Sequence, residues 1–295
     1  MTIRLKIALG SLVVGMLSLG LKYTAFLMTG STALYADALE TIVNVAASLA
    51  TLFAVWMAAK PADQNHPYGH DKAEYFAAVL VGVLIVLASL SIFHSTWQSY
   101  LSSEVVTYSP LGLGVNAAAA ALNGVWAWVL LKAAKKHRSP ALRADGKHLV
   151  ADVFTSLGVL AGVGLVTLTG WQMLDTVLAG LVGVNVLWTG WEVMKESVSG
   201  LMDEAASEDV QAHIRDMIRD HGDGALEAHD LRTRHSGRTT FIDFHLVVPG
   251  DLTVDAAHEI CDRIEQAIGR KVPGAHVTIH VEPDHKAKHR GVLVL

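Results

Sequence analysis

The sequence predicts a membrane α-helical protein, in which six transmembrane helices are followed by a cytoplasmic α+β ferredoxin-like domain. Two observations support this fold class. Hydrophobic residues make up 52% of the 295 residues and charged residues only 17%, which is too apolar for a soluble protein of this length. The apolar residues also concentrate before Met202, whereas the remainder is polar and charged. A single cysteine, Cys261, excludes a disulfide framework and a cysteine-rich zinc finger.

Six apolar stretches are each long enough to cross a bilayer, which takes roughly 20 residues. We expect helices at about 7–28, 31–59, 75–93, 111–131, 148–170 and 173–193. The first stretch could be taken for a signal peptide. However, Lys22 interrupts it and a second span follows directly, so we predict a retained helix.

The distribution of Lys and Arg predicts the orientation of these helices. On one side lie Arg4, Lys6, Lys60, Lys72, a basic cluster over residues 132–143, and Lys195. The opposite connections, around residues 29–31, 98–109 and 170–172, contain no Lys or Arg. We therefore predict a multi-pass protein of the plasma (inner) membrane, surrounded by membrane lipids, with both termini in the cytoplasm.

The polar part of the chain changes to short alternating patterns. We expect helices over 208–220 and 254–269, where apolar residues recur at helical spacing. Alternation predicts strands over 225–234, 239–248 and 276–282. The order helix, strand, strand, helix, strand is typical of a ferredoxin-like domain. The predicted organisation is a transport domain over 1–202, a metal-sensing and dimerisation domain over 203–284, and a flexible tail over 285–295.

Polar residues interrupt the second and fifth apolar stretches, at a depth where a charge is expensive. Glu40 and Asn44 are four residues apart, so a helix places both on one face. His148 and Asp152 repeat this spacing. We predict that the two helices face each other and bind one cation between the four side chains. A single buried carboxylate such as Asp37 can instead be a helix-packing hydrogen bond.

The donor set of this predicted site suggests its ion and its chemistry. Two carboxylates, an imidazole and an amide oxygen suit tetrahedral zinc, and also tolerate ferrous iron, cobalt, cadmium or manganese. Metal binding requires deprotonated donors, so protons compete with the metal. His148 is the group best suited to titrate near neutral pH. The sequence therefore predicts an antiporter in which one state binds metal and the other binds protons.

Two further groups of residues have the composition of metal sites. The loop after the second span contains Asp63, His66 and His70, and the predicted soluble domain contains His229, His245, His258, His280 and Glu282. Of fifteen histidines in the chain, ten follow residue 200, which is a weak compositional indication of transition-metal binding. Exposed histidines in loops and on strands also occur without any metal, and this alternative stays open.

Several motifs together resemble those of a known family. They are Ser31-x-Ala-Leu-x-Ala-Asp37-Ala-Leu, PADQNHPYGHDKAE over 61–74, His148-x-x-x-Asp152, AHDLRTR over 228–234, FIDFH over 241–245 and IHVEP over 279–283. The chain resembles the cation diffusion facilitators, and within them the bacterial zinc and ferrous-iron efflux branch. The resemblance implies a homodimer that exports divalent metal in exchange for protons by alternating access.

The resemblance also assigns roles to the three groups of residues. It implies a transport site at Glu40, Asn44, His148 and Asp152, a loop site at Asp63, His66 and His70, and a paired metal cluster at the dimer interface on His229, His245, His258, His280 and Glu282. The pair Glu40 and Asn44 departs from the zinc branch, which usually has Asp-x-x-x-Asp or His-x-x-x-Asp. With one acid replaced by an amide, we expect a weaker hold on the metal and faster release.

Two other functions remain as alternatives. A membrane-anchored metal sensor without transport would use the same soluble histidines. An intramembrane metalloenzyme would need an open metal position and a general base, and the chain contains no His-Glu-x-x-His. We expect no enzymatic reaction and no nucleic-acid partner.

Overall fold

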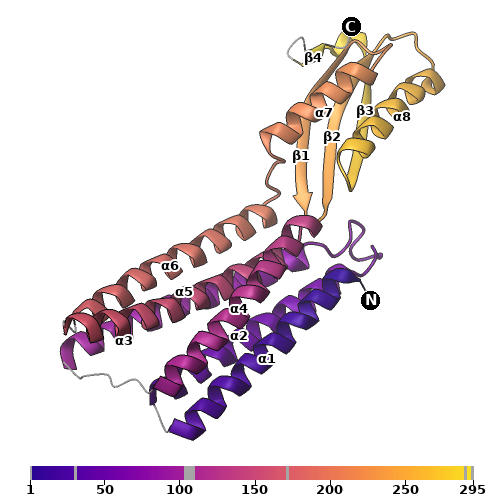
Figure 1. Cartoon of the computed structure of the whole chain (residues 1–295). Coiled ribbons are helices and arrows are strands. Elements are labelled where there is room, and N and C mark those ends of the chain that lie inside the picture. The colour runs from indigo at the N-terminus through magenta and orange to yellow at the C-terminus, as the bar shows by residue number, and fades with distance from the viewer. Residues whose placement is uncertain (1, 30–31, 103–109, 171–172, 289–290, 294–295) are drawn as a thin grey trace. The chain divides into compact units, whose positions relative to one another are not determined.

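The computed structural model describes residues 2–29, 32–102, 110–170, 173–288 and 291–293 (Figure 1). The chain divides into two compact units, Met1–Val198 and Ser199–Leu295. Long helices make up the first unit, and the second contains a mixed four-stranded sheet with two helices. The predicted class, a helical membrane part followed by an α+β part, is confirmed.

Six long helices precede the sheet: α1 (Ile3–Thr29), α2 (Thr32–Ala58), α3 (Ala73–Ser102), α4 (Pro110–His137), α5 (Pro140–Thr169) and α6 (Met173–Leu201). Within the described residues, all of these except α5 are long and apolar enough to cross a membrane by themselves. The first half of helix α5 contains Arg143, Asp145, Lys147 and Asp152. Such polar residues inside a membrane helix are expected to face the protein interior.

Helix α5 begins earlier than the sequence predicted. The predicted helices ended at residue 131 and resumed at 148, yet α4 continues to His137 and α5 begins at Pro140. Proline suits the first helical position because the amide hydrogen it lacks would have no partner there. The hydroxyl of Ser139 caps the helix by accepting from the Leu142 amide at 3.3 Å. His148 therefore lies about two turns inside the helix rather than at its start.

Helices α1, α2, α4 and α5 pack against one another, and α3 contacts both α2 and α5. Helix α6 lies against α3, where the hydroxyl of Ser89 donates to the Gly183 carbonyl at 2.9 Å. Small residues permit this close approach, since a side chain on Gly190 would meet Val86.

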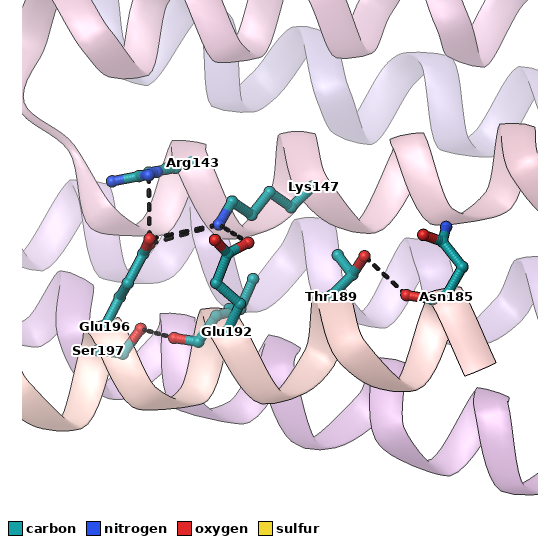
Figure 2. A network of polar contacts seen from close by, with 8 residues as sticks. Arg143, Lys147, Asn185, Thr189, Glu192, Glu196 and Ser197 are labelled. Carbon is teal, nitrogen blue, oxygen red and sulfur yellow. Dashed lines mark hydrogen bonds and ion pairs between the residues drawn. The ribbon is translucent and has the colours of Figure 1, made fainter. Parts of the chain in front are cut away.

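Charged side chains connect α5 to α6 (Figure 2). Lys147 of α5 lies 2.8 Å from Glu192 and 3.5 Å from Glu196 of α6, and Arg143 lies 3.0 Å from Glu196. The two glutamates are four residues apart, so a helix presents both on one face. This network is partly exposed, in contrast to the buried polar groups deeper along α5.

The second unit contains α7 (Glu208–His221), β1 (Glu227–Ser236), β2 (Thr239–Val248), α8 (Val254–Lys271), β3 (Ala275–Pro283), a 3-10 turn (Asp284–Lys286) and β4 (Val292–Leu293). The strand order is β3-β2-β1-β4, with β2 parallel to β3 and the other pairs antiparallel. Helices α7 and α8 cover one face of the sheet (Figure 1). Ile218, Phe244, Leu246 and Ile264 are in the buried core between them.

Strand β4 was not predicted, because the chain after residue 284 was expected to be flexible. Val292 and Leu293 pair with Ala228 and Glu227 of β1. The Gly291 amide also donates to the Glu227 carboxylate at 3.1 Å. A two-residue strand is too short for an alternating pattern to be visible in the sequence.

Candidate metal centres

Three of the four residues predicted for the membrane site meet between α2 and α5. The amide nitrogen of Asn44 donates to an oxygen of Asp152 at 2.6 Å, and its carbonyl oxygen lies 2.7 Å from Nε2 of His148. The exposed fractions are 4% for Asn44, 3% for His148 and 9% for Asp152. The Asn44 amide therefore connects an imidazole to a carboxylate inside the helical unit.

Glu40 is the fourth predicted residue, and it belongs to α2 one turn before Asn44. Its side chain lies outside the described residues, as does that of Asp37. The participation of Glu40 in this centre stays a prediction.

Asn123 of α4 is a member of this group that the sequence analysis missed. Its amide nitrogen donates to the same oxygen of Asp152 at 3.2 Å, and the residue is 3% exposed. Asp152 thus accepts hydrogen bonds from two side-chain amides. A lone amide in the apolar run AAAAALNG was the available signal.

Two buried atoms in this group have no hydrogen-bond partner among the described residues. They are Nδ1 of His148 and the amide oxygen of Asn123. Buried polar atoms without partners are rare, because leaving them unpaired costs free energy. An imidazole nitrogen and an amide oxygen are both ligands of divalent transition metals. The group is therefore chemically suited to a divalent cation.

The predicted loop residues also come together. In the connection between α2 and α3, Asp63 lies 3.2 Å from Nδ1 of His66 and 3.4 Å from Nε2 of His70. These three residues offer ligand atoms within 4.8 Å of one another. The pKa of Asp63 is lowered chiefly because its carboxylate accepts a hydrogen bond from the His66 amide. An ionised carboxylate beside two imidazoles can hold a transition-metal ion.

A row of histidines crosses the sheet on the face opposite to α7 and α8. His229 of β1 pairs in register with His245 of β2, which pairs in register with His280 of β3. The ring centroids are 5.3 Å apart for the first pair and 4.9 Å for the second. Side chains alternate between the two faces of a strand, so the neighbour of His245, Phe244, points into the core instead.

Carboxylates lie beside this histidine row. Glu282 of β3 is 3.3 Å from His229, 3.2 Å from His245 and 3.7 Å from His280. Both ring nitrogens of His229 lack a hydrogen bond within the described part of the chain. The sequence analysis missed Glu227, which is 2% exposed and 3.5 Å from His229. The row and its carboxylates provide imidazole and oxygen donors suited to zinc.

The backbone near the row is irregular. The register between β1 and β2 shifts between His229 and Arg232, and Asp230 has a positive φ of 55°. Bulges of this kind redirect side chains, and Asp230 joins His229 and His245 as a possible ligand group. A hydrogen bond from Lys288 lowers the pKa of Asp230, with the Lys288 charge contributing.

His258 lies apart from the row in this chain. It belongs to α8, on the other face of the sheet, and its described ion pair is with Asp262 at 3.7 Å. Its side chain is 74% exposed. If His258 shares a metal with the strand histidines, as predicted, it must therefore come from a second copy of the chain.

The comparisons with known proteins agree with this architecture. Residues 8–202 match the family model of the cation efflux transmembrane domain, and residues 206–284 match that of the cytoplasmic domain of cation efflux proteins. The chain belongs to the cation diffusion facilitator family. It is a cation-efflux transporter of divalent metals that crosses a membrane several times.

Relatives are similar over most of their length. The transporter sll1263 of Synechocystis sp. is 43% identical over 266 residues, or 90% of this chain and 86% of the relative. The cation-efflux pump FieF of Escherichia coli O9:H4 is 33% identical over 280 residues, or 94% of this chain and 91% of that pump. The solved metal-bound C-terminal domain of the CzcD transporter from Thermotoga maritima is 29% identical, covering 25% of this chain and 87% of that domain, with a TM-score of 0.24.

Proposed function

We propose that this facilitator exports divalent transition metals from the cytoplasm in exchange for protons. Zinc is the principal cargo, and ferrous iron, cobalt, cadmium and manganese are alternatives. The observation that carries the proposal is the buried contact of Asn44 with both His148 and Asp152. Placing an ionisable side chain at membrane depth costs free energy. Such side chains are characteristic of ion and proton pathways in membrane proteins.

The contacts suggest how the exchange takes place. A metal ion that enters needs a carboxylate oxygen of Asp152 and an unprotonated nitrogen of His148. To use Nε2 of His148, it must displace that nitrogen's contact with Asn44. Protonation of His148 and Asp152 removes the same ligand atoms and expels the metal. Metal and protons thus occupy the same side chains in alternate states.

The amide of Asn44 tunes this exchange. A neutral amide contributes an oxygen ligand but no charge, so the metal is held by a weaker electric field than two ionised acids would create. We infer a transporter of modest affinity with fast release. The related FieF proteins are cation-efflux pumps, which supports export as the direction.

The histidine row serves regulation in this proposal. Metal bound by His229, His245, His280 and Glu282 would hold two cytoplasmic domains together, with His258 supplied across a homodimer interface. Two linked states of the dimer would then respond to cytoplasmic metal. The Lys and Arg distribution supports an inner-membrane protein with both termini in the cytoplasm.

The test is metal uptake into vesicles that contain the purified protein and carry a proton gradient. We expect wild-type uptake of zinc, and at least some of the other metals, to follow the gradient. His148→Ala should abolish uptake. The matched control is His94→Ala, because His94 of α3 is an exposed histidine that contacts Gln98 in its own helix.

Equal uptake by both variants would contradict the role of His148. No wild-type uptake of any of these metals, combined with intact metal binding by the sheet residues, would instead favour a membrane-anchored sensor. The histidine row makes that alternative specific, because it brings three histidines and Glu282 together within one chain.

A further inference from the structure

Asp145 is a buried carboxyl group outside the three metal centres. It lies in α5, three residues before His148, and is 0% exposed. The hydroxyl of Ser11 from α1 donates to one of its oxygens at 2.5 Å, and the hydroxyl of Ser48 from α2 donates to the other at 3.3 Å. The two hydroxyls are 3.4 Å apart. Three helices therefore close around one carboxyl group.

A second buried acid provides an internal comparison. Glu74 of α3 is 1% exposed, and its carboxylate pairs with Arg4 at 2.6 Å and accepts from Ser139. At this position the chain thus supplies an arginine beside the buried acid. Within the described residues, the hydrogen bonds of Asp145 come only from neutral hydroxyls. A buried carboxylate without a cation is strongly disfavoured, so this group requires a proton or another cation.

Described cations on the surrounding helices have other partners. Arg4 of α1 pairs with Glu74, and Lys132 of α4 lies over the Trp128 ring. On α5 itself, Arg143 and Lys147 pair with glutamates of α6, and His148 is one helical turn away from Asp145.

The position of Asp145 is one helical turn from the membrane metal centre. On α5 it precedes His148 by three residues, towards the end that begins at Pro140. On α2 its partner Ser48 follows Asn44 by four residues, which is also one turn. Both helices therefore place this group on the same side of the centre. The Lys and Arg distribution predicts that this side faces the cytoplasm.

We propose that Asp145 is a proton-binding site of the exchange cycle, between the metal centre and the cytoplasm. The inference rests on the proposed proton-coupled export. In the loaded state the carboxyl group is neutral, and its O–H donates to a serine hydroxyl. In the unloaded state the proton has passed to cytoplasmic water, and the hydroxyls of Ser11 and Ser48 both donate to the carboxylate. Asp145 carries the coupling ion and does not ligate the metal.

The decisive variant is Asp145→Asn in the full-length protein, because it keeps the shape and removes the titrating group. Two transport modes are compared in vesicles: zinc uptake driven by a proton gradient, and exchange of labelled for unlabelled zinc without a gradient. We expect gradient-driven uptake to fall by roughly tenfold or more, the size of a typical coupling between two sites. Zinc exchange should stay near the wild-type rate. Asp145→Glu should restore part of the gradient-driven uptake.

Infrared spectroscopy provides a readout that does not depend on transport. The wild type should show the C=O stretch of a protonated carboxyl group that disappears at high pH and is missing from Asp145→Asn. Absence of this signal would overturn the proposal. So would unchanged gradient-driven uptake in Asp145→Asn, or a loss of zinc exchange equal to the loss of uptake. Failure of export itself would appear separately, as wild-type protein that moves no metal.

Discussion

The membrane centre and the histidine row of the sheet use similar side chains but are assembled differently. In the sheet, strand register alone aligns His229, His245 and His280, because paired residues on neighbouring strands lie about 4.7–4.9 Å apart across the ladder. In the membrane unit, Asn44 and Asp152 are 108 residues apart and meet only through helix packing. The first site is a consequence of local geometry, and the second depends on the whole bundle.

The two groups also differ in charge. Glu282 reaches all three histidines of the row, and Glu227 lies beside His229. The described membrane group has one carboxylate, and two amides already donate to it. Among the described residues, the sheet group thus places acids beside histidines, whereas the membrane group surrounds its acid with amides.

The largest expected effect is that of Asp152→Asn. This change removes the carboxylate to which Asn44 and Asn123 donate. We expect gradient-driven zinc uptake to fall by more than about 100-fold, since loss of a ligand should exceed the 10–100-fold typical of ligand partners. Metal binding by the sheet should be unaffected. In titration calorimetry of the full chain, the heat of zinc binding at the membrane centre should therefore disappear, and the heat of binding at the sheet should remain. Loss of both heats would mean that the two centres are not independent.

His229→Ala tests metal binding by the histidine row of the sheet. If the row binds metal, metal at 100 times its Kd should stabilise the wild-type protein by about 2.7 kcal/mol. The variant should lose this stabilisation, which is measured as a metal-dependent rise in the Tm of the second unit. His221→Ala is the matched control, because His221 is an exposed histidine of α7 that contacts the Met217 carbonyl of its own helix. A metal-dependent rise that survives in His229→Ala would refute the assignment of the row.

Asn44→Asp makes the membrane centre more like the sheet by adding a charge. We expect zinc affinity to rise by roughly tenfold, because part of the added attraction is offset by desolvation of the carboxylate. Release should slow, so the maximal uptake rate should fall while the zinc concentration for half-maximal uptake also falls. Both quantities come from one concentration series of vesicle uptake. A variant with weaker zinc binding would show that Asn44 is needed as a hydrogen-bond donor.

The smallest effect concerns the exposed network between α5 and α6 (Figure 2). Lys147 and Glu192 are 2.8 Å apart, but half of the Glu192 side chain is exposed, at 50%. Solvent screening limits such a pair to about 0.2–1 kcal/mol. A double-mutant cycle with Lys147→Ala and Glu192→Ala, measured by denaturant unfolding, should give a coupling energy in this range. A much larger value would mean that charge pairs outside the core also hold the helices together.

Local spacing made parts of both centres predictable. The interval of four residues between His148 and Asp152 indicated a shared helix face, and strict alternation over 276–282 put His280 and Glu282 on one strand. The partners Asn123 and Glu227 could not be predicted, because they reach the centres from other elements through packing. Asp145 had a visible signal, its place one turn before His148, but only its burial among hydroxyls distinguishes it from an ordinary polar residue.

The amide of Asn44 has a consequence for the order of events at the centre. One side chain contacts both Nε2 of His148 and an oxygen of Asp152, so neither atom can turn towards a metal ion without breaking a contact with the same amide. We therefore expect the two groups to leave Asn44 together, as one step, rather than one after the other.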